Sequence, residues 1–277
     1  MEHGFVAVET ADGSLTLRHP VHGETMHSRA GARTQARERY ALACILGRVL
    51  PGKRRLLDIG TGLAFNLAAA HERHRALTPG EPLEAVSLEL GADVLRAGLE
   101  LPPDPDPAFR AFHEPVRDAL RRALTSTRGE PDSLWRGEVA DDFVLELRFG
   151  DARHTLLATQ GSFDAVFLDP FSPGVEGELW DPGFLAAVAA RMSDGAVLAT
   201  YSAATRVRAG LLAAGLAVGP APRVGAKSEG TLAARGRVLP AFAPRVERRL
   251  RQRAAVLGAS PGHSRDEVGD AQGGRGL

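Results

Sequence analysis

The amino-acid sequence predicts an α/β fold with a mostly parallel, twisted sheet and helices on both faces. Strand-like runs recur between residues 54 and 201, and helical segments separate most of them, which is the order that builds parallel strands. The run Phe163–Leu168 is largely apolar, as expected of a strand covered on both faces. Glycines or acids follow several strands directly, at the sheet edge where such folds bind ligands.

Length and composition limit the possible classes of protein. The 277 residues are enough for one large domain with appendages or for two small ones, and 44% hydrophobic residues can build a full core. A single cysteine, Cys44, excludes an internal disulfide framework and is compatible with a reducing cytoplasm. The sequence begins without a signal-peptide pattern and has no apolar run as long as a membrane span. We therefore expect a soluble, cytoplasmic protein without a membrane partner.

Three regions are predicted along the chain. Residues 1–50 hold a β-hairpin over residues 5–18, turning at Asp12-Gly13, and a helix over residues 32–50 with Tyr40 and Cys44 on its inner face. Residues 51–240 form the main domain, with a helical insertion at about 101–142. Residues 241–277 hold a basic helix over 245–257 and a tail, rich in glycine, serine and charge, that we expect to be disordered.

The first strand of the main domain leads into a glycine turn. Leu56 and Leu57 begin the strand, Asp58-Ile59-Gly60-Thr61-Gly62 follows, and a helix is predicted from Leu63 to Ala70. Glycines allow a sharp turn and a close approach of the backbone to a ligand. Asp58 argues against a bound pyrophosphate and suits a ligand with a positive or hydroxyl-bearing end, such as S-adenosylmethionine. The alternative is a purely structural turn.

Two further strands end in acids. Residues 83–90 form the second strand, and Glu89 at its carboxyl end suits the hydroxyls of a ribose, although a solvent-facing glutamate is the alternative. Residues 143–151 form the third strand and end in Gly150-Asp151. Asp151 suits the amino group of an adenine, or caps the next helix, or does both.

The segment Phe163–Pro173 is the most informative one. Its strand ends in Asp169-Pro170-Phe171-Ser172-Pro173. A carboxylate on a rigid proline turn can accept hydrogen bonds from an amine, and Phe171 can pack against the flat part of the molecule that carries this amine. The alternative is a turn in which the aspartate caps a backbone group.

The remaining segments are predicted more simply. The insertion contains a helix over 109–124, with Trp135 in an irregular stretch. The C-terminal half has a helix over 184–192, a strand over 196–201 and a helix that carries Arg206 and Arg208, followed by short strands at 216–219 and 238–243.

Positive charge gathers near the C-terminus, although the whole chain has a net charge of zero. Residues 201–257 contain eleven basic and two acidic residues, a local net charge of +9 that can attract a polyanion. Arg206, Arg208 and Lys227 are our candidates for substrate contacts, and a solvated arginine surface is the alternative. His71 and His74 are predicted to lie on an exposed helix face, and we expect no metal site.

These motifs together resemble one family. The sequence is similar to the methyltransferase half of MnmC, the bifunctional enzyme that completes 5-methylaminomethyl-uridine at the tRNA wobble position, and to its single-domain relatives. The resemblance covers roughly residues 10–235, most of the chain, and Ala64 is an apparent extra residue in the glycine turn. The blocks that carry it are Gly23–Ser28 with the following Gly31-Ala32, Asp58–Leu63, Ser87–Leu90, and Phe163–Pro173 with Glu178–Pro182.

The resemblance implies a Rossmann-like methyltransferase fold and S-adenosylmethionine as the cofactor. It implies a cofactor site made by the glycine turn and the strand-end acids, with Asp169 facing the amine of a tRNA substrate and Phe171 beside it as the second catalytic residue. A separate flavin-dependent oxidoreductase would act upstream. Small-molecule amine methylation, polyamine aminopropyl transfer and non-catalytic binding remain the alternatives. The expected cofactor-binding residues are Asp58, Gly60, Thr61, Gly62, Glu89, Asp151 and Asp169.

Overall fold

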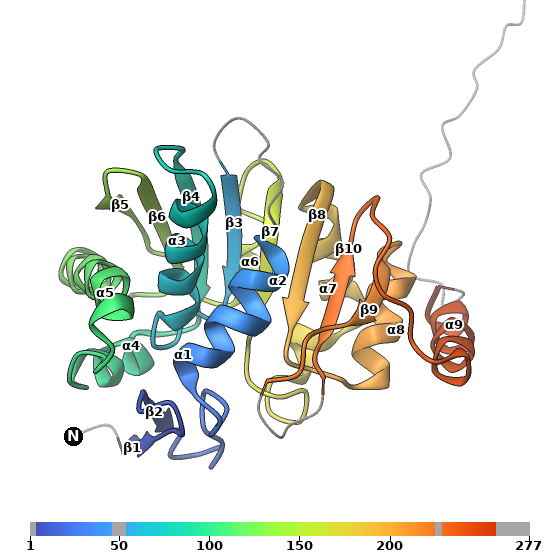
Figure 1. Cartoon of the computed structure of the whole chain (residues 1–277), viewed down its shortest axis with the longest axis horizontal. Coiled ribbons are helices and arrows are strands. Elements are labelled where there is room, and N and C mark those ends of the chain that lie inside the picture. The colour runs from blue at the N-terminus through green and yellow to red at the C-terminus, as the bar shows by residue number, and fades with distance from the viewer. Residues whose placement is uncertain (1–3, 46–53, 225–228, 259–277) are drawn as a thin grey trace, which may run out of the picture.

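The computed structural model describes residues 4–45, 54–224 and 229–258, and its main feature is an eight-stranded sheet with the order β5-β6-β4-β3-β7-β8-β10-β9 (Figure 1). Strands β3, β4, β6, β7 and β8 run parallel, whereas β5 and β10 are antiparallel to their neighbours. The strands are β3 (Arg54–Ile59), β4 (Leu83–Glu89), β5 (Leu134–Ala140), β6 (Phe143–Phe149), β7 (Phe163–Leu168), β8 (Met192–Thr200), β9 (Ala217–Pro220) and β10 (Thr231–Ala234).

Helices cover both faces of the sheet, as predicted. Neighbouring residues of a strand point to opposite faces, so Leu56 joins one core cluster and Leu57 the other. The first cluster contains residues of the N-terminal helix, α3, α4 and α5, and the second contains residues of α6, α7 and α8. The helices are α3 (Phe65–Leu77), α4 (Ala92–Leu99), α5 (Pro107–Thr127), α6 (Ala152–Thr155), η2 (Gly177–Trp180), α7 (Pro182–Ala190), α8 (Thr205–Ala213) and α9 (Pro244–Gly258).

The order in which the chain adds strands to the sheet reverses at β3, which pairs with β4 on one side and with β7 on the other. The connections after β3 and β7 therefore leave the sheet toward opposite sides. This arrangement opens a crevice at the carboxyl ends of the two strands. Gly60 follows β3 and Asp169 follows β7, so the predicted cofactor turn and the predicted amine-facing loop meet at this point.

The N-terminal hairpin is confirmed, with β1 (Val6–Glu9) antiparallel to β2 (Leu15–Arg18). It lies below the lower end of the sheet in Figure 1, the end toward which β3 and β8 point. The following helix has three parts, α1 (Ala32–Gln35), a π-helical turn η1 (Ala36–Ala41) and α2 (Leu42–Cys44). The predicted continuation of this helix over residues 46–50 lies outside the described residues, as do Lys227 and the predicted tail from residue 259.

Two predictions of local structure are wrong. The stretch around Trp135 is not irregular but forms β5, whose exposed edge position gives it alternating rather than continuously apolar residues. Residues 238–243 form no strand. Pro240 has no N–H to donate, and the strand lies instead at the short, fully buried β10. The division of the chain at residues 50 and 240 stays a prediction.

The described part of the chain contains no helix that is long and apolar enough to cross a membrane.

Candidate functional site

A cavity of about 920 Å³ lies at the carboxyl ends of β3, β4, β6 and β7. Side chains from the N-terminal segment, residues 5–39, close its other side. Among the described residues that line it are seven carboxyl side chains and one arginine, so the cavity favours a cationic ligand. Seven of the predicted site residues line it, namely Gly60, Thr61, Gly62, Glu89, Asp151, Asp169 and Phe171.

The glycine turn is held in a conformation that other residues rarely adopt. Gly60 has φ of 93° and Gly62 has φ of 50°. A Cβ atom on Gly60 would lie 2.8 Å from the carbonyl oxygen of Asp169, so only glycine lets the two turns touch. Around the corresponding position on Gly62 there is open space. Ala64 ends the turn with φ of 65°, a left-handed conformation that is unfavourable for alanine.

Glu89 holds the far side of the glycine turn. Its carboxylate accepts a hydrogen bond from the Gly62 amide at 3.0 Å and a longer one from the Gly91 amide at 3.5 Å. The side chain is buried, and this burial raises its pKa to about 7 against the opposing effect of these amides. A carboxylate in this setting has free lone pairs for hydroxyl donors such as those of a ribose.

Asp169 is held by residues from two distant segments. The Tyr40 hydroxyl donates to Oδ1 at 2.5 Å, and the Asn66 amide donates to Oδ2 at 2.8 Å. Burial raises the pKa of Asp169 to about 7, while the two hydrogen bonds oppose this rise. Both carboxylate oxygens have fixed directions, and the side chain still lines the cavity.

The loop that follows Asp169 is fixed at both ends. The Phe171 amide donates to Glu176 at 2.8 Å, and the Trp180 indole donates to the Phe171 carbonyl at 2.9 Å. The Tyr201 hydroxyl donates to the Pro170 carbonyl at 2.9 Å. A loop with so many anchors keeps Phe171 in one position without a ligand.

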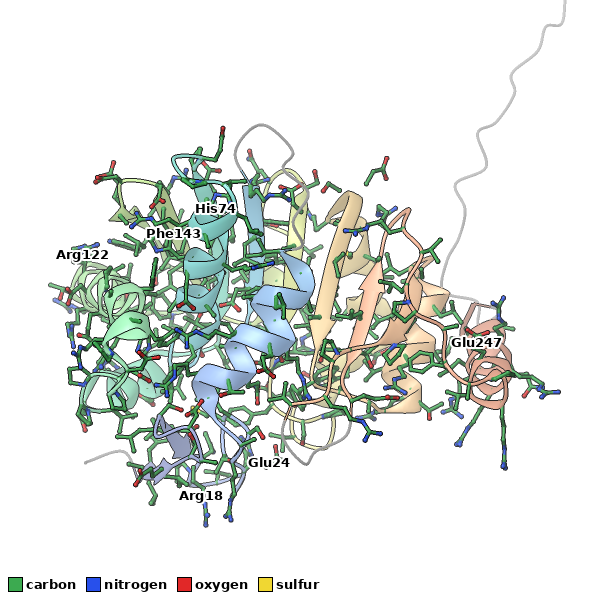
Figure 2. All side chains as sticks on the ribbon, in the orientation of Figure 1. Arg18, Glu24, His74, Arg122, Phe143 and Glu247 are labelled. Atoms are coloured by element: carbon green, nitrogen blue, oxygen red, sulfur yellow. The ribbon has the colours of Figure 1, made fainter. Side chains whose placement is uncertain are left out.

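Aromatic rings from the N-terminal segment meet Phe171 at the cavity wall. His19 and His22 stack with ring centroids 4.1 Å apart, and both rings lie about 5 Å from the Phe171 ring, at 5.2 and 5.3 Å. Nearby, the Ser172 hydroxyl donates to Glu24 at 2.7 Å, which ties the same two segments together. Figure 2 shows Glu24 at the lower end of the molecule, beside the hairpin. The N-terminal segment thus supplies one wall of the site.

Comparison with known proteins identifies the family. A family profile described as "S-adenosyl-L-methionine-dependent methyltransferase" matches residues 113–236. MnmC2 from Aquifex aeolicus is 30% identical in sequence and superimposes with a TM-score of 0.74, over 89% of this chain and 75% of that one. The chain belongs to the MnmC-type family of S-adenosylmethionine-dependent methyltransferases. Its cofactor is therefore S-adenosylmethionine.

Two relatives show the extent of the match. The uncharacterized protein MJ0670 of Methanocaldococcus jannaschii is 30% identical over 97% of this chain and 69% of that protein. The tRNA 5-methylaminomethyl-2-thiouridine biosynthesis bifunctional protein MnmC of Paracidovorax citrulli is 35% identical over 73% of this chain. The match covers 31% of that MnmC protein, so this chain spans about a third of its length.

Asp151 lies at the edge of the methyltransferase cavity and caps α6. Its carboxylate accepts from the Arg153 amide at 2.8 Å and also pairs with the Arg153 guanidinium, which lowers its pKa. Capping does not prevent a cofactor contact, because the side chain still lines the cavity.

Asp58 is the one predicted cofactor residue that does not line the cavity. Its carboxyl is fully buried beneath the turn, where the Ser87 hydroxyl donates to it at 2.7 Å and Ser87 in turn bonds Thr61. Burial raises its pKa to about 8. The expectation that Asp58 faces the ligand is wrong, because side chains alternate along β3 and this one points into the protein.

The predicted substrate arginines have different environments. Arg208 is buried and donates to Thr231 at 2.9 Å and to the Gly230 carbonyl at 3.0 Å, so it is not available to a substrate, contrary to our prediction. Arg206 is exposed and donates to the Pro173 carbonyl in the loop after Asp169. Lys227 lies outside the described residues.

His71 and His74 are buried rather than exposed. The His71 ring bonds Asp142 at 2.8 Å, and the His74 ring bonds the Glu81 carbonyl at 2.9 Å. In the part of the chain that the structure describes, no group of three or more His, Cys, Asp or Glu residues is placed to hold a metal ion.

Sequence reasoning missed the residues that reach the site from elsewhere. Tyr40 was assigned only to the inner face of a helix, and the roles of Glu24, Asn66 and Glu176 were not predicted. Each acts through a contact with the loop at residues 169–172. No local pattern marks such contacts, although Glu24 and Asn66 do lie within or beside the blocks that resemble the family.

Proposed function

We propose that this chain methylates the amine of an aminomethyl group on a modified wobble uridine of tRNA. The observation that carries the proposal is the position of Asp169, which lines a cation-favouring cavity, touches the glycine turn and has a pKa of about 7. The family supports the same chemistry, since MnmC relatives are described as tRNA 5-methylaminomethyl-2-thiouridine biosynthesis proteins.

The residues present fit the cofactor. Gly62 lines the cavity with no atom within 4 Å of its Cβ position, which leaves room for a ligand against the backbone. We assign Glu89 to the ribose hydroxyls and Asp151 to the adenine end, with Gly60, Thr61 and Gly62 lining the space between them. When bound, S-adenosylmethionine supplies an electrophilic methyl carbon on a sulfonium that leaves as a neutral sulfide.

The proposed role of Asp169 is to prepare the substrate amine. A primary alkylamine is mostly protonated at neutral pH and then has no lone pair to attack the methyl carbon. Asp169, whose pKa of about 7 lies near working pH, accepts the ammonium proton, and Tyr40 and Asn66 fix the direction of its oxygens. Once this proton has passed from Asp169 to solvent water, the restored carboxylate stabilises the positive charge that forms on nitrogen as the new N–C bond forms. Phe171 packs against the ring that carries the amine.

The direct test is mass analysis of nucleosides from tRNA that carries aminomethyl-uridine, after incubation with the protein and labelled S-adenosylmethionine. We expect one added methyl group on the aminomethyl nitrogen. Asp169→Asn keeps the shape of the side chain but removes the base, so turnover should fall about 10²–10⁴-fold while the cofactor still binds.

The same assay separates small-molecule amine methylation and non-catalytic binding from the proposal. Free alkylamines and polyamines serve as competing substrates, and a fully modified tRNA serves as the blank. Methylation of free amines with none on tRNA would replace the proposal with small-molecule methylation. Cofactor binding without a product on any of these substrates would indicate a binding module. The aminomethyl group itself must come from a reaction that exposes the amine, for which we propose a separate flavin-dependent oxidoreductase.

A further inference from the structure

Helix α9 forms an arginine-rich edge of the molecule. It packs along α8, and its residues Leu250 and Ala254 are buried. Phe242, in the segment that leads into α9, lies under the guanidinium of the buried Arg208 at 4.3 Å from the ring centroid. Arg208 therefore fixes the start of this helix, although it meets no substrate.

The outer face of α9 carries five arginines. Arg245, Arg248, Arg249, Arg251 and Arg253 are all exposed, and the helix contains a single acid, Glu247. Within the described residues none of the five forms an ion pair, whereas exposed arginines elsewhere, such as Arg121 and Arg136, pair with carboxylates. Figure 2 shows side chains with terminal nitrogen atoms that project from α9 into solvent. Unpaired guanidinium groups on one rigid helix create a strong positive potential.

We propose that this arginine face of α9, together with the exposed Arg206, binds the phosphate backbone of the RNA substrate outside the cavity. The proposal rests on the proposed function for the identity of the RNA. The cavity is lined by seven carboxyl side chains, which repel phosphates. A nucleic acid that inserts one modified base there must therefore place its backbone elsewhere, and α9 offers the complementary charge. Guanidinium groups suit this role because they bind phosphates in a bidentate manner.

Helix α8 connects this face to the site. It begins at Thr205, beside Arg206, which bonds the loop after Asp169. The helix has nine residues, a length of roughly 13 Å at 1.5 Å per residue. A backbone that crosses Arg206 and continues along α8 therefore reaches α9 within a few nucleotides.

A membrane surface fits α9 less well. An interfacial helix needs a continuous apolar face to insert among lipids. In α9 the inward-facing Leu250 and Ala254 are already buried, and the exposed Val246 and Val256 lie ten residues apart. RNA needs only the charged face that is present.

The test compares two variants that lose the same charge. Arg248→Gln/Arg249→Gln/Arg251→Gln removes three arginines of α9. The control, Arg121→Gln/Arg122→Gln/Arg136→Gln, removes three exposed arginines from α5 and β5, at the opposite edge of the sheet (Figure 1). The binding of fluorescent tRNA is measured by anisotropy over a range of salt concentrations. The variants' affinity for S-adenosylmethionine shows whether the site is still folded.

We expect the α9 variant to bind tRNA about tenfold more weakly at physiological salt. The slope of log K against log salt should fall in magnitude by about two to three, since each lost phosphate contact removes about 0.7–0.9. The control should keep the slope of the wild type. Arg248→Lys/Arg249→Lys/Arg251→Lys should keep the salt dependence of the wild type, because the slope depends on the positive charge and not on the shape of the guanidinium group.

Two outcomes would overturn the proposal, and a third separates it from the proposed reaction. Equal slopes for the α9 variant and the control would show that α9 does not contact the backbone. Binding of the wild type to phosphatidylserine vesicles, lost in the α9 variant while tRNA binding is kept, would assign the face to membranes. If the wild type binds tRNA through α9 but transfers no methyl group to aminomethyl-uridine, this surface stands and the proposed reaction fails.

Discussion

At the scale of single residues, the proposed chemistry of the site depends on the ionisation of Asp169. Burial raises its pKa to about 7, and the hydrogen bonds from Tyr40 and Asn66 keep it from rising further. A carboxyl group with a pKa near working pH can both take a proton from an ammonium group and release it afterwards. Substitutions of residues that contact this side chain should therefore change the pH dependence of methyl transfer while the fold is kept.

Tyr40→Phe tests this balance. Loss of the 2.5 Å hydrogen bond removes an interaction that favours the carboxylate, so the pKa of Asp169 should rise further. The acidic limb of the pH profile of kcat/KM for methyl transfer should then move upward by about one unit. Tyr201→Phe is the matched control, because that hydroxyl donates to the Pro170 carbonyl instead. An unmoved acidic limb in Tyr40→Phe would contradict the role of Tyr40.

The sequence predicted the residues that end strands better than those that reach across the fold. Gly60, Glu89 and Asp169 each follow an apolar strand, and parallel strands end at one edge of the sheet. Tyr40 is 129 positions from Asp169, and its contact depends on how the N-terminal helix packs. Arg208 was misassigned because an arginine in a helix is usually exposed, and its buried partners lie at β10, which was not predicted.

At the scale of elements, a π-helical turn positions Tyr40. The residues of η1 make wider turns than those of an α-helix, and such turns often occur at functional sites. The periodicity of apolar residues predicted this helix. It did not predict the π-helical turn, because α-helical and π-helical turns are built from the same types of residue. The edge strand β5 and the short strand β10 were not predicted, because neither has the long apolar run that marked the central strands.

The glycine turn leads to a prediction about two neighbouring positions. Gly60→Ala should lower the free energy of unfolding by about 2–4 kcal/mol, because its Cβ meets the Asp169 carbonyl at 2.8 Å and φ is 93°. Gly62→Ala should lower the free energy of unfolding by only about 1 kcal/mol. Its Cβ enters open space, so the cost comes from the left-handed φ of 50° alone. Urea unfolding of both variants measures the difference, and equal losses would show that the contact between the turns is not tight.

At the scale of the whole molecule, three buried carboxyl groups link stability to pH. Burial raises the pKa of Asp58 to about 8 and those of Glu89 and Asp169 to about 7. The folded protein therefore holds their protons at pH values where the unfolded chain has released them. Their contribution to stability falls as pH rises from about 4 to 8, by about 1.4 kcal/mol per unit for a single group. Buried histidines such as His27, whose pKa is lowered to about 4, oppose this trend below about pH 6.

Asp58→Asn isolates one of these contributions. Asparagine resembles the protonated acid, so the variant should gain stability relative to the wild type as pH rises from 5 to 8, and the difference should level off above the pKa. The free energy of unfolding of both proteins is measured by urea titration at several pH values. Subtracting the wild-type value from that of the variant cancels the contributions of the histidines.

Asp106→Asn is the control for this experiment. Against the opposing effect of burial, hydrogen bonds from the Ala108 and Phe109 amides lower the pKa of Asp106, so the cost of that change should be constant between pH 5 and 8. If the difference in the free energy of unfolding between Asp58→Asn and the wild type is also independent of pH, then Asp58 ionises normally in the folded protein.

The contact between Gly60 and the Asp169 carbonyl matters for anyone who wishes to redesign substrate choice in this scaffold. No side chain separates the two turns, so a backbone change made to accommodate a new acceptor also displaces the glycine turn that we propose binds the methyl donor. Engineering should begin instead at His22 and Glu24. These side chains approach the same pocket from the N-terminal segment, so new shapes introduced there do not alter the backbone at the contact between the two turns.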